Sequence, residues 1–152
     1  MRKIKIGQIG VCHEHAGAKI TALRLRPDIF EIAGVVDDRA GKAAKFAGSD
    51  LGPYEGLKWL TEDELFKIPG LQAVTVETPN LELVPAAPRC MERNMAMHMD
   101  KPSGDDLALF AKLLDGCKAR GLPFQMGYMF RGNPAMKWIM NAVRQGWLGE
   151  VF

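Results

Sequence analysis

The sequence has few of the features that mark secreted, membrane-bound or nucleic-acid-binding proteins. Its only cysteines are Cys12, Cys90 and Cys117, an odd and widely spaced set that predicts reduced thiols in a cytoplasmic protein rather than a disulfide framework. The 20 lysines and arginines nearly balance the 18 aspartates and glutamates, and no basic run occurs, so we expect neither a nucleic acid nor a membrane as partner. No long apolar segment or small-residue cleavage site follows residues 1–3, which argues against a signal peptide.

What remains is the composition of an ordinary globular domain. The 152 residues are 47% hydrophobic and 25% charged, long enough for one domain with a real core. We find no internal repeat and no low-complexity linker.

Short apolar strands alternate with helical patterns along the chain, and this alternation predicts an α/β protein with a doubly wound parallel sheet covered on both faces. Two further details can be tested: Ser103 is expected to cap the long helix that ends at Gly121, and Pro85 and Pro88 are expected to make the first turns of their helix short or irregular. Strands are expected near residues 4–9, 32–36, 73–76, 95–99 and 124–128, and helices near 16–26, 40–46, 61–68, 80–93, 103–120 and 133–146.

The first forty residues contain the most informative pattern. An apolar strand runs into a glycine turn at Gly10 and then into a helix, and a second strand ends at Asp37. The N-terminus of such a helix favours a phosphate, and an acidic residue at the tip of the next strand can accept hydrogen bonds from a ribose. Asp37 follows His15 by 22 residues, close to the spacing of about 20 known for dinucleotide sites.

The glycine pattern is incomplete, and a simpler interpretation stays open. If Gly10 is the first glycine of G-x-G-x-x-G, then Cys12 and His15 occupy the second and third positions. The turn by itself is equally consistent with a tight strand-to-helix connection, and Asp37 with a helix N-cap.

Further motifs lie where later strands should end: residues 78–80 after one strand and residues 100–102, Asp-Lys-Pro, after the next. The carboxyl ends of parallel strands share one edge of a sheet, so these segments should meet the glycine turn in a single crevice. With these motifs, and with residues 127–131 and 149–151, the whole chain resembles the Gfo/Idh/MocA family of NAD(P)-dependent oxidoreductases, whose N-terminal domain is Rossmann-like.

The resemblance implies a role for each matching residue. Lys101 corresponds to the family's lysine beside the hydride-transfer centre and is the predicted catalytic residue, and Asp37 favours NAD over NADP. Asp100 stands where the family usually has glutamate, and Leu83 and Val84 stand where it often has a histidine. The residues expected to bind the cofactor are Gly10, Val11, Cys12, His15, Asp37, Asp38, Thr78, Pro79, Asn80, Asp100, Lys101 and Arg131.

The family also has a second, α+β substrate domain, which is expected to be absent from this chain. Residues 1–130 are then the NAD(P)-binding domain, and residues 131–152 are a connecting helix and the first strand of the missing domain. The resemblance places the substrate-binding sheet, an Asp/His pair that assists catalysis and the oligomer interface in that second domain. We therefore expect residues 1–152 alone to lack a working active site.

The expected function is hydride transfer between a nicotinamide cofactor and a hydroxyl of a small sugar, polyol or cyclitol. Two alternatives are an NAD-binding regulatory or sensing module without turnover, and a scaffold that uses Trp138, Trp147 and Leu148.

Several of these residues also have ordinary interpretations. Lys101 and Arg131 could equally be charged side chains exposed to solvent. Residues 78–80 could equally form an ordinary turn. His13 and His15 invite a metal interpretation, which we reject because no third ligand at suitable spacing is evident. The alternating methionines at 95, 97 and 99 predict a core strand, with His98 as a satisfied core residue.

Overall fold

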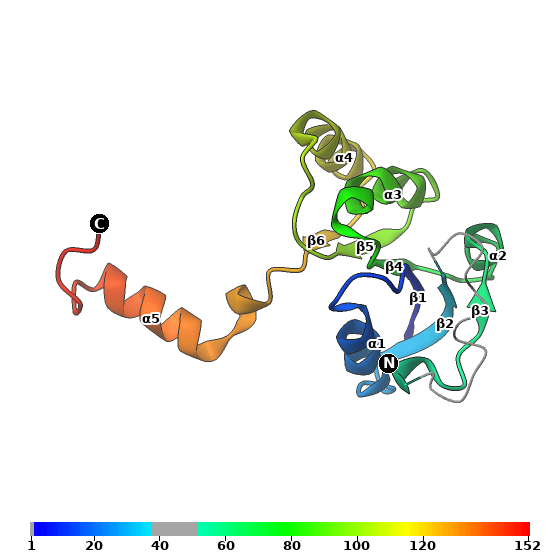
Figure 1. The fold of residues 1–152 in the computed structure, drawn as a ribbon, viewed down its shortest axis with the longest axis horizontal. Coiled ribbons are helices and arrows are strands. Elements are labelled where there is room, and N and C mark those ends of the chain that lie inside the picture. Colours follow the sequence, from blue (N-terminus) through cyan, green and yellow to red (C-terminus); the bar gives the residue numbers. More distant parts are fainter. Residues whose placement is uncertain (1, 38–51) are drawn as a thin grey trace.

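The computed structural model describes residues 2–37 and 52–152. The helix predicted near 40–46 lies outside these residues, as does Asp38. Figure 1 shows the sheet with helices on both sides. The strands are β1 (Ile4–Ile9), β2 (Phe30–Val36), β3 (Trp59–Leu60), β4 (Ala73–Val76), β5 (Ala96–Met99) and β6 (Phe124–Met126); the α-helices are α1 (Ala16–Arg24), α2 (Glu62–Phe66), α3 (Asn80–Glu92), α4 (Leu107–Ala119) and α5 (Pro134–Arg144), with 3₁₀ turns η2 (Gly52–Tyr54) and η3 (Met129–Gly132).

The six strands form one parallel sheet in the order β3-β2-β1-β4-β5-β6. This is the doubly wound, Rossmann-like order, and it confirms the predicted fold class. Strands β1, β2 and β3 are added toward one edge of the sheet, and β4, β5 and β6 toward the other. The order of strands therefore switches between the neighbouring parallel strands β1 and β4. Ligands of such sheets bind beyond the carboxyl ends of the strands at this switch point.

The core divides between the two faces of the sheet because successive strand residues point to opposite sides. On one face, Val74, Val76, Met97 and Met99 pack in a large buried cluster with residues of helices α3 and α4. On the other face a smaller cluster forms around α1: Ile6, Ile20, Leu23, Val35 and Tyr54. The methionines of β5 are therefore core residues, as predicted.

Two local predictions are wrong. The cap of helix α4 is Asp106, whose side chain accepts a hydrogen bond from the Leu109 N–H at 2.8 Å, rather than Ser103. Helix α3 continues from Asn80 to Glu92 through Pro85 and Pro88. Each proline removes one backbone hydrogen bond, but the helix buries Leu83, Val84, Ala86, Ala87 and Cys90, and this burial outweighs the loss.

Other local predictions are confirmed. The helices expected near 61–68 and 80–93 are present: Thr61 and Glu64 form a capping box at the start of α2, and Asn94 follows the end of α3 with a positive φ of 58°. Asn133 caps α5 through its side chain. Helix α5 extends away from the sheet (Figure 1), and Trp138, Ile139 and Met140 on it are exposed. No helix among the described residues is long and apolar enough to cross a membrane.

Candidate functional site

The turn after β1 is held tightly against the ends of its two neighbouring strands. The Gly10 N–H donates to the Val36 carbonyl at 3.0 Å, and the His13 N–H donates to the Glu77 carbonyl at 3.1 Å. Gly10 has a φ of +91°, and a Cβ there would stand 2.6 Å from the Thr78 nitrogen. Only glycine therefore allows the turn to lie this close to the end of β4.

Helix α1 begins directly after this turn. His15 is its N-cap residue and makes no side-chain capping hydrogen bond to the helix, and no acidic residue occupies its first turn. The positive end of the helix dipole and its first N–H groups are thus directed at the switch point without a carboxylate of the first turn to neutralise them. Such a helix end favours a phosphate group.

Two hollows lie along the carboxyl edge of the sheet beside this turn. One, of about 430 Å³, lies between the turn and the start of α3, and Cys12, His13, Pro79 and Asn80 are among its lining residues. The other, of about 280 Å³, is lined by Asp37 and Thr78 among others. Glu82 lines both hollows. They bring together residues that the sequence places at the ends of three different strands, and they form adjoining parts of one crevice.

Asp100 lies at the end of β5 and is the most strongly held acidic group of the site. It is 1% exposed, accepts a hydrogen bond from the Lys101 N–H at 2.6 Å on Oδ1, and has Oδ2 3.2 Å from His15 Nδ1. Gly127 permits this position, because a Cβ there would meet Oδ1 at 2.8 Å. Burial opposes ionisation of Asp100, but these hydrogen bonds and the nearby His13 and Lys19 outweigh it and hold its pKa below the ordinary value.

Lys101 follows at the same edge of the sheet and is partly exposed. Its Nζ lies 3.4 Å from Glu14 Oε1, and Glu14 belongs to the turn after β1. The side chain of Lys101 therefore reaches across from β5 to the glycine turn, as the sequence predicted from the convergence of strand ends.

The two histidines of the turn converge on Asp100. His15 Nδ1 lies 3.2 Å and His13 Nδ1 3.7 Å from Asp100 Oδ2. The three side chains have ligand atoms that all lie within 4.8 Å of one another. A metal site was rejected from the sequence for want of a third ligand, but the fold brings a third candidate ligand, Asp100, beside the two rings. The third ligand is 85 residues from His15 in the chain, so no local spacing could reveal it.

Sequence reasoning missed Glu77, a buried acid directly after β4. Its side chain is fully buried, and Lys19 Nζ lies 4.0 Å from its Oε1. Burial raises its pKa from 4.5 to about 8, with the negative charge of Asp100 adding to the effect and Lys19 opposing it. The sequence did contain a signal for a buried acid, because Glu77 directly follows the apolar strand β4.

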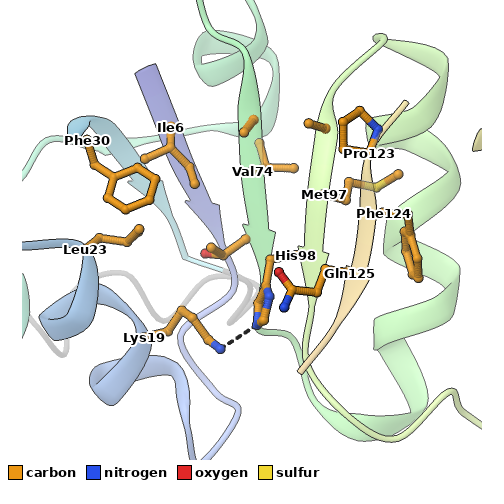
Figure 2. A pocket seen from close by; sticks show the side chains of 13 residues that line it. Ile6, Lys19, Leu23, Phe30, Val74, Met97, His98, Pro123, Phe124 and Gln125 are labelled. Carbon is orange, nitrogen blue, oxygen red and sulfur yellow. Dashed lines mark hydrogen bonds between the residues drawn. The ribbon is translucent and has the colours of Figure 1, made fainter. Parts of the chain in front are cut away.

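A separate cavity of about 320 Å³ lies on the α1 side of β4, β5 and β6 (Figure 2). His98 faces it together with Lys19 and Gln125, and its Nε2 contacts Lys19 Nζ. Burial and the charge of Lys19 lower the pKa of His98. His98 lies on the opposite face from the buried methionines and is only partly buried, so it is a hydrogen-bonded residue of a cavity wall rather than the core residue that was predicted.

Arg131 is placed apart from the crevice. It lies in η3, with its guanidinium 5.4 Å from the centre of the Tyr128 ring, and it lines a groove that also includes Lys19 and His98. The two hollows beside the glycine turn do not include it among their lining residues. Of the predicted site residues within the described part of the chain, Arg131 is the one that the structure locates in a different groove.

Comparison with known proteins supports the family interpretation. No family model matches the chain. It is 25% identical over 146 residues to the rhizopine catabolism protein MocA of Rhizobium meliloti, covering 96% of this chain and 42% of MocA. The chain thus spans less than half the length of this curated relative, and the resemblance stated from the motifs is confirmed.

Solved structures share the fold. The UDP-N-acetylglucosamine 3-dehydrogenase GnnA of Acidithiobacillus ferrooxidans has a TM-score of 0.71 at 24% identity, covering 93% of this chain and 44% of that one. KijD10, a 3-ketoreductase from Actinomadura kijaniata solved with NADP and TDP-benzene, has a TM-score of 0.78 at 21% identity, covering 95% of this chain and 43% of that one.

Proposed function

We propose that this chain, similar to MocA over 96% of its length, is the NAD(P)-binding domain of a Gfo/Idh/MocA-type oxidoreductase. In this proposal the whole enzyme transfers a hydride between the nicotinamide and a hydroxyl-bearing carbon of a sugar, polyol or cyclitol. Residues 1–130 bind the cofactor, and residues 131–152 lead toward a substrate-binding domain.

The observation that carries the proposal is the crevice at the carboxyl edge of the sheet. It joins Asp37, the glycine turn at Gly10 and Thr78 through two adjoining hollows, and Lys101 reaches the same turn from β5. A dinucleotide bound at a switch point needs an acceptor for a ribose, a helix N-terminus for the diphosphate and a polar group at the nicotinamide end. The crevice offers these three features in that order.

Each cofactor contact follows from this order. Asp37 accepts hydrogen bonds from the adenosine ribose, and the diphosphate lies over the turn and the start of α1. The nicotinamide end then lies toward Asp100 and Lys101. The residues proposed to bind the cofactor are Gly10, Val11, Cys12, His15, Asp37, Thr78, Pro79, Asn80, Asp100 and Lys101. Two more residues complete the proposed set: Asp38, which lies outside the described residues, and Arg131, which lines another groove.

Asp37 makes NAD the proposed cofactor. A carboxylate at this position accepts from both ribose hydroxyls and repels the 2′-phosphate of NADP. KijD10, which has the same fold, was solved with NADP, so the fold also accommodates the phosphorylated cofactor.

Lys101 is the proposed catalytic residue. A bound nicotinamide would supply the hydride acceptor. The Lys101 amine would take the proton that the substrate hydroxyl loses on oxidation, and in the reverse direction its ammonium would return that proton to the carbonyl oxygen. A sugar-like substrate is supported by the names of the similar proteins, a UDP-N-acetylglucosamine 3-dehydrogenase and a 3-ketoreductase.

The proposal is tested by titrating the purified chain with NADH and following the fluorescence of the reduced nicotinamide. Saturable binding of one NADH per chain, competed by NAD, is the expected result. No saturable binding of either NADH or NADPH would refute the cofactor site.

A further inference from the structure

His13, His15 and Asp100 form a compact group of metal-ligating side chains at the switch point. His13 and His15 come from the turn after β1, and Asp100 comes from the end of β5. His13 and Asp100 are buried, whereas the His15 side chain is 26% exposed. Because the His15 side chain is partly exposed, an ion could enter from solvent beside it and reach the two buried ligands, His13 and Asp100.

The distances suit a first-row divalent metal. Ligands bound tetrahedrally at about 2.0–2.1 Å from zinc lie about 3.4 Å from one another. The observed separations from Asp100 Oδ2 bracket that value, at 3.2 Å to His15 Nδ1 and 3.7 Å to His13 Nδ1. All three ligand atoms lie within 4.8 Å of one another, so an ion bound among them would draw the two rings closer together.

Neighbouring hydrogen bonds orient two of the three ligands. His13 Nε2 lies 3.1 Å from the Lys101 carbonyl oxygen. A carbonyl only accepts, so Nε2 carries the hydrogen and Nδ1, which lies 3.7 Å from Asp100 Oδ2, keeps its lone pair. That lone pair now accepts from the His15 N–H at 3.2 Å, which a metal would replace. A ligating histidine typically donates its other N–H to a carbonyl or carboxylate in this way.

Asp100 is held in the same manner. Its Oδ1 accepts from the Lys101 N–H, so Oδ2 is the oxygen left beside the two rings. Glu14 is not part of the set, because its exposed carboxylate lies by Lys101 Nζ at 3.4 Å and by His15 Nε2 at 3.6 Å, the ring nitrogen that does not contact Asp100. The chain thus supplies two imidazoles and one carboxylate oxygen, a donor set that suits Zn²⁺ and related divalent ions.

We propose that His13, His15 and Asp100 bind one divalent transition-metal ion, for which Zn²⁺ is the probe. Three protein ligands leave a coordination position for water or for an oxygen of a bound substrate, as in catalytic rather than structural zinc sites. The inference concerns these side chains directly and does not depend on the proposed dinucleotide activity. Without an ion, the same atoms form a histidine–carboxylate hydrogen-bond network, and the test separates the two states.

The test measures Zn²⁺ binding to the purified chain by equilibrium dialysis and Co²⁺ binding by its visible absorption. We expect one ion per chain and the spectrum of a four-coordinate cobalt site. His15→Ala should lower the affinity by at least about tenfold. This variant should fold because His15 is partly exposed, and circular dichroism checks that; Asp100→Asn should have the same effect on binding.

Two matched variants control for other ligands. His98→Gln removes the third histidine of the chain, which lies in the separate cavity, and should leave binding unchanged. Cys12→Ser removes the thiol next to His13 and should also leave it unchanged. Unchanged binding in His15→Ala, loss in Cys12→Ser, or no binding at micromolar zinc would each overturn the proposed site.

The same samples separate this inference from the proposed function. NADH titration of the metal-free chain reports on the dinucleotide site, and zinc binding without nucleotide reports on the three ligands. Saturable NADH binding without zinc binding refutes only the metal site. Zinc binding without NADH binding refutes only the cofactor site.

Discussion

Gly10 lies against the backbone of Thr78 so closely that a Cβ at position 10 would stand 2.6 Å from the Thr78 nitrogen. This contact joins the ends of β1 and β4 at the point where the sheet reverses its order. It makes the glycine turn and residues 78–80 two walls of one crevice, although they are far apart in the sequence.

Replacing Gly10 with alanine should therefore destabilise the protein and weaken nucleotide binding. The new methyl group meets backbone atoms that cannot rotate away, at a φ of +91° that alanine rarely adopts. Gly121→Ala is the matched control, because Gly121 also has a positive φ of +65° but nothing lies within 4 Å of its Cβ position. Urea unfolding should show a cost about 1–3 kcal/mol larger for Gly10→Ala than for the control. Equal costs would contradict the close approach.

Asp37 should determine the preference between the two nicotinamide cofactors. We expect Asp37→Ala to lower NADH affinity by about tenfold, since hydrogen bonds from the ribose to a carboxylate are lost. NADPH affinity should rise relative to NADH because the repulsion of the 2′-phosphate is removed. Asp28→Asn is the control, as Asp28 pairs with Arg26 on the surface. Fluorescence titration measures both affinities. An unchanged ratio of NADH affinity to NADPH affinity would argue against the role of Asp37 at the ribose.

Lys101 should affect turnover far more than cofactor binding, to which it would contribute one contact among several. In a protein that joins these residues to a substrate domain, Lys101→Ala should reduce kcat by about 100-fold or more while NADH affinity stays within about twofold, because proton transfer contributes to the rate alone. Glu14→Gln, which removes the partner of Lys101 Nζ at 3.4 Å, should have a much smaller effect. Full activity of Lys101→Ala would refute the catalytic assignment.

Glu77 should make stability fall as the pH rises from weakly acidic to alkaline values. Burial raises its pKa from 4.5 to about 8 in the folded protein, so the folded state binds this proton more tightly than the unfolded chain. The resulting stability is fully present below pH 4.5 and is lost as the pH rises through about 8. The free energy of unfolding of Glu77→Gln relative to that of the natural chain should therefore be higher at pH 8.5 than at pH 5, by a difference on the order of a few kcal/mol.

Glu64→Gln provides a control of opposite sign. Hydrogen bonds from the Thr61 backbone and side chain lower the pKa of Glu64, so its contribution is present above its ordinary pKa and lost on acidification. Thermal unfolding at several pH values measures both variants. A pH profile of Glu77→Gln parallel to that of the natural chain would show that Glu77 does not titrate as described.

Much of the fold could be predicted because its signals are local. The apolar strands, the capping box at Thr61 and the left-handed stop at Asn94 each depend on residues within a few positions of one another. The cap of α4 was misassigned to Ser103 because Asp106, three residues on, is an equally good N-cap type, and only the path of the chain after Pro102 decides between them. The continuity of α3 through two prolines depended on burial that no local pattern reveals.

The sequence by itself determined the order of the five longer strands and the helices between them, the glycine that the first turn requires and the acidic residue at the end of β2; it did not predict the two-residue strand β3. Periodicity and turn chemistry act over a few residues, so they can be read from the chain. Only the tertiary structure decided that His13 and His15 meet Asp100, that Glu77 is buried, and that His98 and Arg131 face other hollows. Those facts depend on how distant strand ends come together and on which side chains lose contact with water, and both are properties of the assembled sheet.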